Sequence, residues 1–141
     1  MNGRFPNTIL YKFPRMSPQD SEIWRRFLLE EQNNFERFDY DFPVGSGVDP
    51  GPEISANYRK DYIDLTKKRI DAVGYNKSQV TIFEVKPRAG TTALGQLLTY
   101  QELWMLDHKG TSVPTLSVVT EFMNPEEISI YTHHRIKIFI V

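Results

Sequence analysis

The sequence contains no cysteine among its 141 residues. Without thiols it can form neither a disulfide framework nor a thiolate metal site, and a reducing compartment is favoured. It also lacks any apolar run close to the roughly 20 residues that cross a bilayer. Its N-terminus, MNGRFPNTIL, has no basic-then-apolar order of the kind that marks a secretory signal. We therefore expect a cytoplasmic protein that does not associate with membranes.

An excess of charge of either sign is absent as well. The chain has 17 basic and 18 acidic residues, for a net charge of −1. A protein that grips nucleic acid over a wide surface is usually basic, so tight non-specific binding is disfavoured. Short basic clusters could still form a positive rim around an acidic centre, although most such clusters are solvated faces. These clusters are Lys67-Lys68-Arg69, Lys86 with Arg88, Arg25-Arg26 and His133-His134-Arg135.

The length is that of one domain, which we expect to span residues 1–141, with residues 1–16 as an N-terminal arm or edge strand. Ser17 followed by Pro18 predicts a helix from there to about Phe35. Residues 42–52 are rich in Pro, Gly and Ser and predict a loop. The remaining pattern predicts strands at 69–75, 80–86, 115–120 and 136–141, a helix at 92–107, and a short helix after Asn124. This order is typical of an α/β fold with a mixed sheet covered by helices.

The two β-rich runs around Gly74–Ser78 predict a hairpin, and Pro87 is expected to end its second strand. Glu84 and Lys86 share one face of that strand, while Phe83 and Val85 share the other. Arg69, Asp71 and Val73 share a face of the first strand. If Tyr75 pairs with Val80, Asp71 lies opposite Glu84, with the two Cβ atoms about 5 Å apart. A slip of one residue would put the two acids on opposite faces.

Two opposed carboxylates repel each other, and a divalent cation between them would remove that cost. Mg²⁺ takes one or two carboxylates and completes its shell with water and phosphate oxygens. Lys86 could stabilise developing charge or orient an attacking water. The alternative is a surface cluster of charges across two strands. Because both strands are apolar on both faces, as covered central strands are, we favour the metal site.

The predicted helix at 92–107 adds a second group. Its apolar face includes Leu97, Tyr100 and Trp104, and Gln96 lies at the edge of that face, one turn before Tyr100. An amide beside a phenol could hold a water or a phosphate. The alternative is an ordinary boundary glutamine beside a core tyrosine.

The segments RIDAV, IFEVKP and GQLLTYQELW together resemble the PD-(D/E)XK nuclease superfamily, and the Gln-x-x-x-Tyr feature is similar to its RecB-like branch. The resemblance covers about residues 69–104. It implies a restriction-endonuclease-like αβββαβ core. It also implies Asp71 and Glu84 as metal ligands with the backbone carbonyl of Val85, Lys86 as the catalytic lysine, and Gln96 with Tyr100 as the supporting pair. The superfamily's usual proline is not next to Asp71.

The superfamily also often places an acid on the first core helix. Glu31 shares a stripe with Ile23, Phe27 and Phe35 at steps of four residues, and is therefore expected to face inward as a further catalytic and metal-binding acid. Glu30 is the second choice.

These features predict a hydrolase: an Mg²⁺- or Mn²⁺-dependent nuclease, without an organic cofactor, that cuts DNA in a bacterial or phage-infected cell. RNA is not excluded as a substrate. The compact chain favours a role in repair, recombination, packaging or mobile-element (phage) DNA processing. One alternative is a catalytically silent module that binds nucleic acid or protein. Another is an endonuclease subunit active only in a transposition-type or strand-processing assembly. With a net charge near zero, a homodimer or partner protein could supply part of the grip on DNA.

Overall fold

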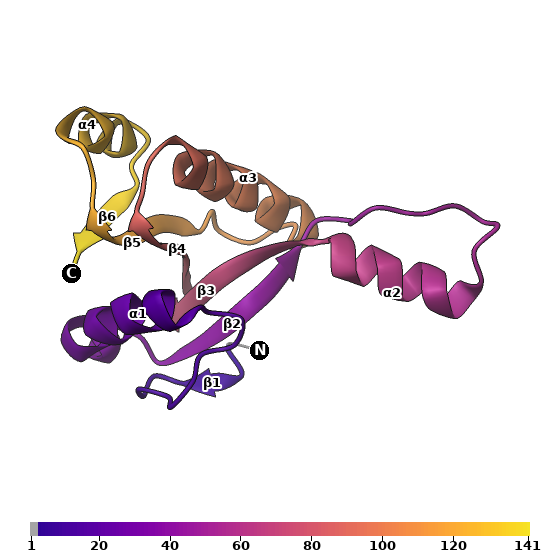
Figure 1. Ribbon diagram of the computed structural model, residues 1–141, viewed down its shortest axis with the longest axis horizontal. Helices are drawn as coiled ribbons and strands as arrows, with labels where there is room; N and C mark the ends of the chain where they lie inside the picture. The colour runs from indigo at the N-terminus through magenta and orange to yellow at the C-terminus, as the bar shows by residue number, and fades with distance from the viewer. Residues whose placement is uncertain (1–2) are drawn as a thin grey trace.

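The computed structural model describes residues 3–141, which form an α/β fold around one mixed sheet (Figure 1). In these residues the sheet has six strands in the order β1-β2-β3-β4-β5-β6. The strands β1 to β4 are antiparallel neighbours, whereas β4, β5 and β6 run parallel. The strands are β1 (Phe5–Pro6), β2 (Arg37–Val44), β3 (Lys68–Asn76), β4 (Gln79–Arg88), β5 (Thr115–Phe122) and β6 (Lys137–Ile140). The helices are α1 (Pro18–Glu31), a 3₁₀ turn (Gln32–Asn34), α2 (Ala56–Thr66), α3 (Thr91–Asp107) and α4 (Pro125–His133).

The helices divide between the two faces of the sheet. In Figure 1, α1 covers one face, whereas α3 and α4 lie on the other. Each face has its own buried cluster: one contains Trp24 and Phe27 of α1 with Phe83 of β4, and the other contains Leu97 of α3 with Ile82 of β4. The αβββαβ order that the resemblance implied is present as α1, β2, β3, β4, α3 and β5, which confirms the predicted fold class. No helix of residues 3–141 has the length and apolarity needed to cross a bilayer.

The β3–β4 hairpin has the predicted register. Tyr75 pairs with Val80, and the ladder continues to Ala72 opposite Phe83. The turn is tighter than predicted, since only Lys77 and Ser78 connect the two strands. Lys77 has a positive φ of 56°, as two-residue hairpin turns require. Beyond Ala72 the two strands no longer pair, and the next residues along this register are Asp71 and Glu84.

β3 changes face at Asp71, so the prediction that Arg69, Asp71 and Val73 share one face is wrong in this detail. Strict alternation would put residues 70 and 72 on the same face. Instead Ala72 joins the cluster on the α1 side, whereas Ile70 joins the cluster on the α3 side. Asp41, opposite on β2, has a positive φ of 50°. Asp71 therefore lies where both β2 and β3 depart from regular strand geometry.

Two predicted boundaries are also wrong. Residues 42–44 belong to β2 and not to a loop, because Phe42 pairs with Ile70 and Val44 with Lys68. Pro87 does not end β4, which pairs with β5 as far as Arg88. The N–H of Val85 points toward Asp71, on the β3 side. Position 87 has the same orientation, so the donor that proline lacks is not needed by the β5 ladder.

The N-terminal segment combines both predicted forms. Phe5 and Pro6 pair with β2 as a short edge strand, and Phe13 and Met16 then enter the core on the α1 side. The first helix ends at Glu31, earlier than predicted, and the 3₁₀ turn fills the remainder of the predicted span.

The connection between β2 and β3 is an arm, residues 45–66, made of a loop and α2. Figure 1 shows it projecting away from the sheet, past the ends of β2 and β3. None of the residues of α2, all of which the structure describes, is buried. This helix was not predicted, although Tyr58, Tyr62 and Leu65 have a helical spacing.

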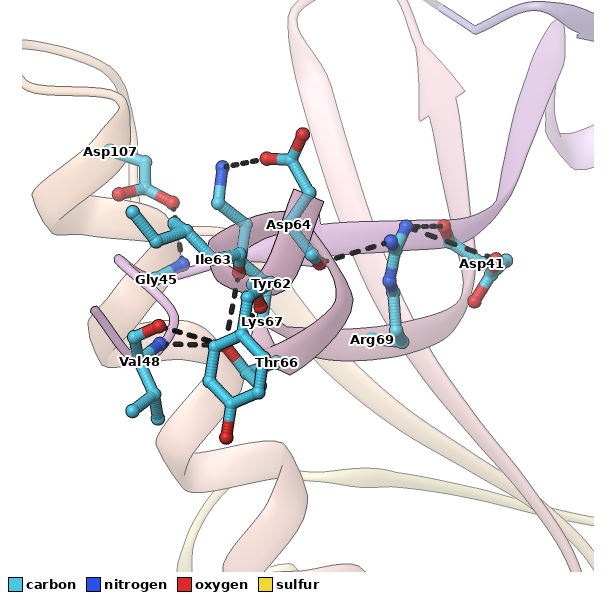
Figure 2. A network of polar contacts seen from close by, with 10 residues as sticks. All are labelled: Asp41, Gly45, Val48, Tyr62, Ile63, Asp64, Thr66, Lys67, Arg69 and Asp107. Atoms are coloured by element: carbon cyan, nitrogen blue, oxygen red, sulfur yellow. Dashed lines mark hydrogen bonds and ion pairs between the residues drawn. The ribbon is translucent and has the colours of Figure 1, made fainter. Parts of the chain in front are cut away.

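Polar contacts hold the base of the arm in place (Figure 2). The Thr66 hydroxyl accepts a hydrogen bond from the Val48 amide at 2.7 Å and donates to the Tyr62 carbonyl at 2.8 Å. The Gly45 amide donates to Asp107 at the end of α3, at 2.9 Å. At Gly47, with φ +68°, an added Cβ would lie 2.2 Å from the Ile63 carbonyl oxygen, so only glycine allows the loop to approach α2 this closely.

Candidate active site

Asp71 and Glu84 meet where β3 and β4 stop pairing. The Asp71 carboxylate accepts a hydrogen bond from the Val85 amide at 2.9 Å, which fixes its position beside β4. The Glu84 side chain lies beside it, and each acid perturbs the pKa of the other. The structure therefore brings the two acids together.

The environment disfavours charge on this pair. Burial raises the pKa of Glu84, which is 3% exposed, and the negative charge of Asp71 raises it further. Burial also raises the pKa of Asp71, against the lowering effect of the Val85 amide. The positive charge of Lys86 lowers both pKa values. The pair is thus a strained arrangement that a cation would relieve.

The lysine and the α3 residues stand around this pair. Lys86, two residues beyond Glu84 on β4, is half-buried and exerts its charge on both acids. Tyr100 of α3 is buried, and its pKa is raised by burial first and then by the charges of Glu84 and Asp71. Gln96 lies one turn earlier, with its side-chain nitrogen 3.5 Å from the Tyr100 hydroxyl. These predicted residues surround the same point.

Two oxygens at this point lack partners. Within residues 3–141, Glu84 Oε1 and Gln96 Oε1 are buried with no hydrogen-bond partner. A buried acceptor without a partner costs about 1–3 kcal/mol, so such groups call for an explanation. The Val85 carbonyl adds a third oxygen nearby, because the N–H and C=O of one strand residue point to the same side, here toward Asp71.

The carboxylate, amide and carbonyl atoms at this point are all oxygens, the ligand type that Mg²⁺ and Mn²⁺ prefer. In the described part of the chain, no three acidic or histidine side chains gather into a metal-holding group. Two carboxylates with amide or carbonyl oxygens still fit a magnesium-type ion, which takes one or two carboxylates and fills its remaining positions with water and substrate oxygens. The residues present therefore fit the ion that the resemblance implied.

Glu31 and Glu30 do not join this group. Glu31 ends α1, where its carboxylate accepts a hydrogen bond from Asn34, and it lines a pocket with Thr81 and Lys137 near the other ends of β4 and β6. Glu30 is exposed. Glu31 is half-buried, as its place on the apolar stripe predicted, but it lies at the end of α1 away from the acidic pair.

The acid that α1 does bring near is Asp20, which sequence reasoning had assigned only to the start of the helix. Asp20 and Lys86 act on each other electrostatically, and the charge of Asp20 raises the pKa of both Asp71 and Glu84. Burial raises the pKa of Asp20 itself, while hydrogen bonding to Ser17 lowers it. An acid three residues after an N-cap serine is ordinary capping, so the sequence held no signal of a second role.

Two grooves flank the start of β3 beside these residues. One, of about 370 Å³, is lined by Lys68, Arg69, Gly95, Gln96, Thr99 and Tyr100. The other, of about 320 Å³, is lined by Pro14, Arg15, Asp41, Leu65, Arg69 and Asp71. Arg69 borders both grooves. A larger pocket of about 620 Å³ lies away from the acidic pair, near Asp39 and Trp104.

Known proteins with similarity to this chain are few. No family model and no curated protein matches the sequence. Among solved structures, the crystal structure of a repair endonuclease from Pyrococcus abyssi is similar, with 13% sequence identity and a TM-score of 0.45. The similarity covers 52% of this chain and 32% of that chain, so this chain spans about a third of that protein's length.

Proposed function

We propose that this protein is a metal-dependent nuclease that hydrolyses phosphodiester bonds in DNA. The single observation that carries the proposal is the pair formed by the buried Glu84 and the half-buried Asp71, with Lys86 beside it, at the point where β3 and β4 separate. Two neighbouring carboxyl groups destabilise a fold that binds nothing there. In a site for a divalent cation and a phosphate, the same two groups are ligands of the ion.

In this proposal Asp71, Glu84 and the Val85 carbonyl hold Mg²⁺ or Mn²⁺, with the unpartnered Gln96 oxygen facing a bound water. The ion, when bound, supplies charge stabilisation at the phosphoryl group and a water of lowered pKa. Asp20 is the best candidate for a supporting acid, in the role first given to Glu31.

The chain's own residues would then share the remaining work. The Lys86 ammonium group stabilises the charge that develops on the phosphate oxygens as the water attacks phosphorus, and it can also orient that water. Tyr100 keeps its proton, since its pKa is raised, accepts a hydrogen bond from the Gln96 side-chain amide, and can donate one to a phosphate oxygen. The groove with Lys68 and Arg69 offers two cations to the neighbouring phosphates.

The biological setting in this proposal is repair, recombination or phage DNA processing. The repair endonuclease among similar structures is compatible with that setting but does not argue for it.

The test is cleavage of supercoiled plasmid and of circular single-stranded DNA with Mg²⁺, Mn²⁺, Ca²⁺ or EDTA. We expect cutting with Mg²⁺ or Mn²⁺ and none with EDTA. Lys86→Ala should lower the rate by a factor of about 100 or more, the contribution typical of a positioned acid–base group. Lys109→Ala, an exposed lysine at the end of α3, is the matched control and should cut like the wild type.

Two results would refute the proposal. One is the absence of cutting at high protein and metal concentrations. The other is a Lys86→Ala variant as active as the control. Binding of DNA without cutting would favour the silent binding module. Cutting that begins only when a partner protein is added would favour the assembly subunit.

A further inference from the structure

The helix α2 of the arm carries two unlike sets of residues. Two residues of α2 bind the loop that precedes it. Arg59 forms a bidentate ion pair with Asp49 at 2.6 and 2.7 Å, and the Thr66 hydroxyl accepts a hydrogen bond from the Val48 amide. A neighbouring stripe of the same helix carries Tyr58, Tyr62 and Leu65, which are 75%, 47% and 70% exposed. Their spacing of four and three residues places them on one stripe of the helix. An 11-residue helix thus turns two aromatic rings and a leucine to solvent.

This stripe is not explained by the stability of the arm. A helix of this length is marginal in water on its own, and packing of an apolar face normally stabilises it. Here polar contacts at the base supply the support (Figure 2). Tyr58, Tyr62 and Leu65 remain exposed. Polar residues on that stripe would have left those contacts intact. The exposed stripe therefore indicates a binding surface.

The stripe leads to the acidic pair. Leu65, at its inner end, lines the same groove as Asp71, together with Arg15 and Arg69. Tyr62 and Tyr58 continue outward from Leu65 along α2, over about 10 Å at 1.5 Å per residue. Whatever occupies the groove at Asp71 can thus extend along the stripe without interruption.

Charge at the base of the arm suits a polyanion. Two acids at the base are paired with cations, Asp41 with Arg15 and Arg69, and Asp64 with Lys67. Within residues 3–141, Lys68 forms no ion pair, and it lines the adjoining groove with Arg69 in the absence of any acid. Aromatic rings near cationic side chains are the combination that holds single-stranded nucleic acid, with bases on the rings and phosphates on the cations, and among the described residues Lys68 is the cation here that no acid pairs.

We propose that the α2 arm binds unpaired bases of the substrate next to the phosphate held at Asp71 and Glu84. Tyr58 and Tyr62 stack on bases, Leu65 packs against the base nearest the groove, and Lys68 with Arg69 holds the phosphates. This rests on the proposed function and sharpens it, because the preferred substrate is then DNA with a single-stranded part, such as a fork or flap, and not a uniform duplex.

The test measures binding and cutting separately. Binding is followed by fluorescence anisotropy with a labelled fork and a labelled duplex of the same sequence, in EDTA, so that no cutting is needed. The wild type should prefer the fork, and Tyr58→Ala with Tyr62→Ala should lower fork affinity by a factor of about 10 or more. Leu106→Ala, which removes an equally exposed leucine on α3, is the control and should bind the fork like the wild type.

Crosslinking checks the wild type directly. A fork with 5-iododeoxyuridine in its single-stranded part should crosslink to the peptide that contains Tyr58 and Tyr62. Crosslinks only elsewhere, or equal fork affinity of wild type and double variant, would overturn the arm proposal. So would a wild type that sediments as a dimer and a double variant that sediments as a monomer, because the stripe would then bind a second copy. If the fork binds through the arm and no metal leads to cutting, the arm proposal stands and the nuclease proposal fails.

Discussion

The helices α1 and α2 are alike at their starts and opposite in their surroundings. Each follows a serine, and each carries apolar residues at helical spacing. Yet α1 buries Ile23, Trp24, Phe27 and Leu28 against the sheet, whereas α2 buries no residue of its fully described length. The same kind of pattern thus builds a core in one place and an open surface in the other. The difference is the partner, which α1 finds in this chain and α2 does not.

The largest expected difference between the helices is in stability. Trp24 is fully buried, stacks on Phe27 and donates to the Tyr40 hydroxyl at 3.0 Å. Trp24→Ala should lower the free energy of unfolding by about 3–5 kcal/mol. Tyr58→Ala, on the exposed stripe of α2, should change it by less than about 0.5 kcal/mol. Urea unfolding followed by far-ultraviolet circular dichroism measures both. Similar losses in both variants would show that α2 packs against something in solution.

The sheet and the arm should also respond to pH in opposite directions. Burial raises the pKa of Glu84, so the folded state binds its proton more tightly than the unfolded state does. That stabilisation is complete below the unfolded pKa and is lost as pH rises toward the folded pKa. In the arm, hydrogen bonding to Arg59 lowers the pKa of Asp49 to about 2, so its contribution is lost only as pH falls.

Metal-free protein should therefore lose thermal stability between about pH 5 and 8, by on the order of 2 kcal/mol. Glu84→Gln should remove most of this dependence. Differential scanning fluorimetry in EDTA across this pH range provides the measurement, with Glu102→Gln, an exposed acid on α3, as the control. Added Mn²⁺ should restore the melting temperature of the wild type at pH 8 and leave Glu84→Gln unchanged. An equal slope in all three proteins would disprove the assignment of the buried charge to Glu84.

The smallest expected effect separates the two ends of α1. Asp20 is close enough to raise the pKa of the acidic pair, whereas Glu31 lies about 16 Å further along the helix at 1.5 Å per residue. Asp20→Asn should weaken Mn²⁺ binding or slow cutting by a factor of about 10, the lower end of the range for supporting residues of metal sites. Glu31→Gln should change neither. Calorimetric Mn²⁺ titration and the plasmid assay measure these two effects. If Glu31→Gln has the larger effect, Glu31 and not Asp20 is the supporting acid of α1.

The sequence predicted what depends on local pairing. The hairpin has the register that the site hypothesis required, with Tyr75 opposite Val80, and this register puts Asp71 level with Glu84. Gln96 and Tyr100 followed from the helical period of α3, an element bounded almost as predicted. These are contacts within one strand pair or one turn of helix, and pattern is sufficient for them.

What the sequence did not predict depends on elements far apart in the chain. Asp20 lies 51 residues before Asp71, and nothing in its own segment distinguishes it from a capping acid. The strand β2 was not predicted because Pro43 and the glycines that follow it suggested a loop. The helix α2, which buries no residue against a core, was not predicted either. The change of face at Asp71 needs the positive φ of Asp41 on the neighbouring strand, which no period-two pattern contains.

β4 has an antiparallel neighbour on one side and a parallel neighbour on the other, and this arrangement sets an order of folding. A hairpin closes within about 1–10 μs, whereas the β4–β5 pair must wait for the crossover through α3. Asp71 and Glu84 therefore meet early, before Tyr100 arrives to cover them. We expect their repulsion to slow the first steps of folding, and a divalent cation that binds the pair to accelerate the folding of this chain.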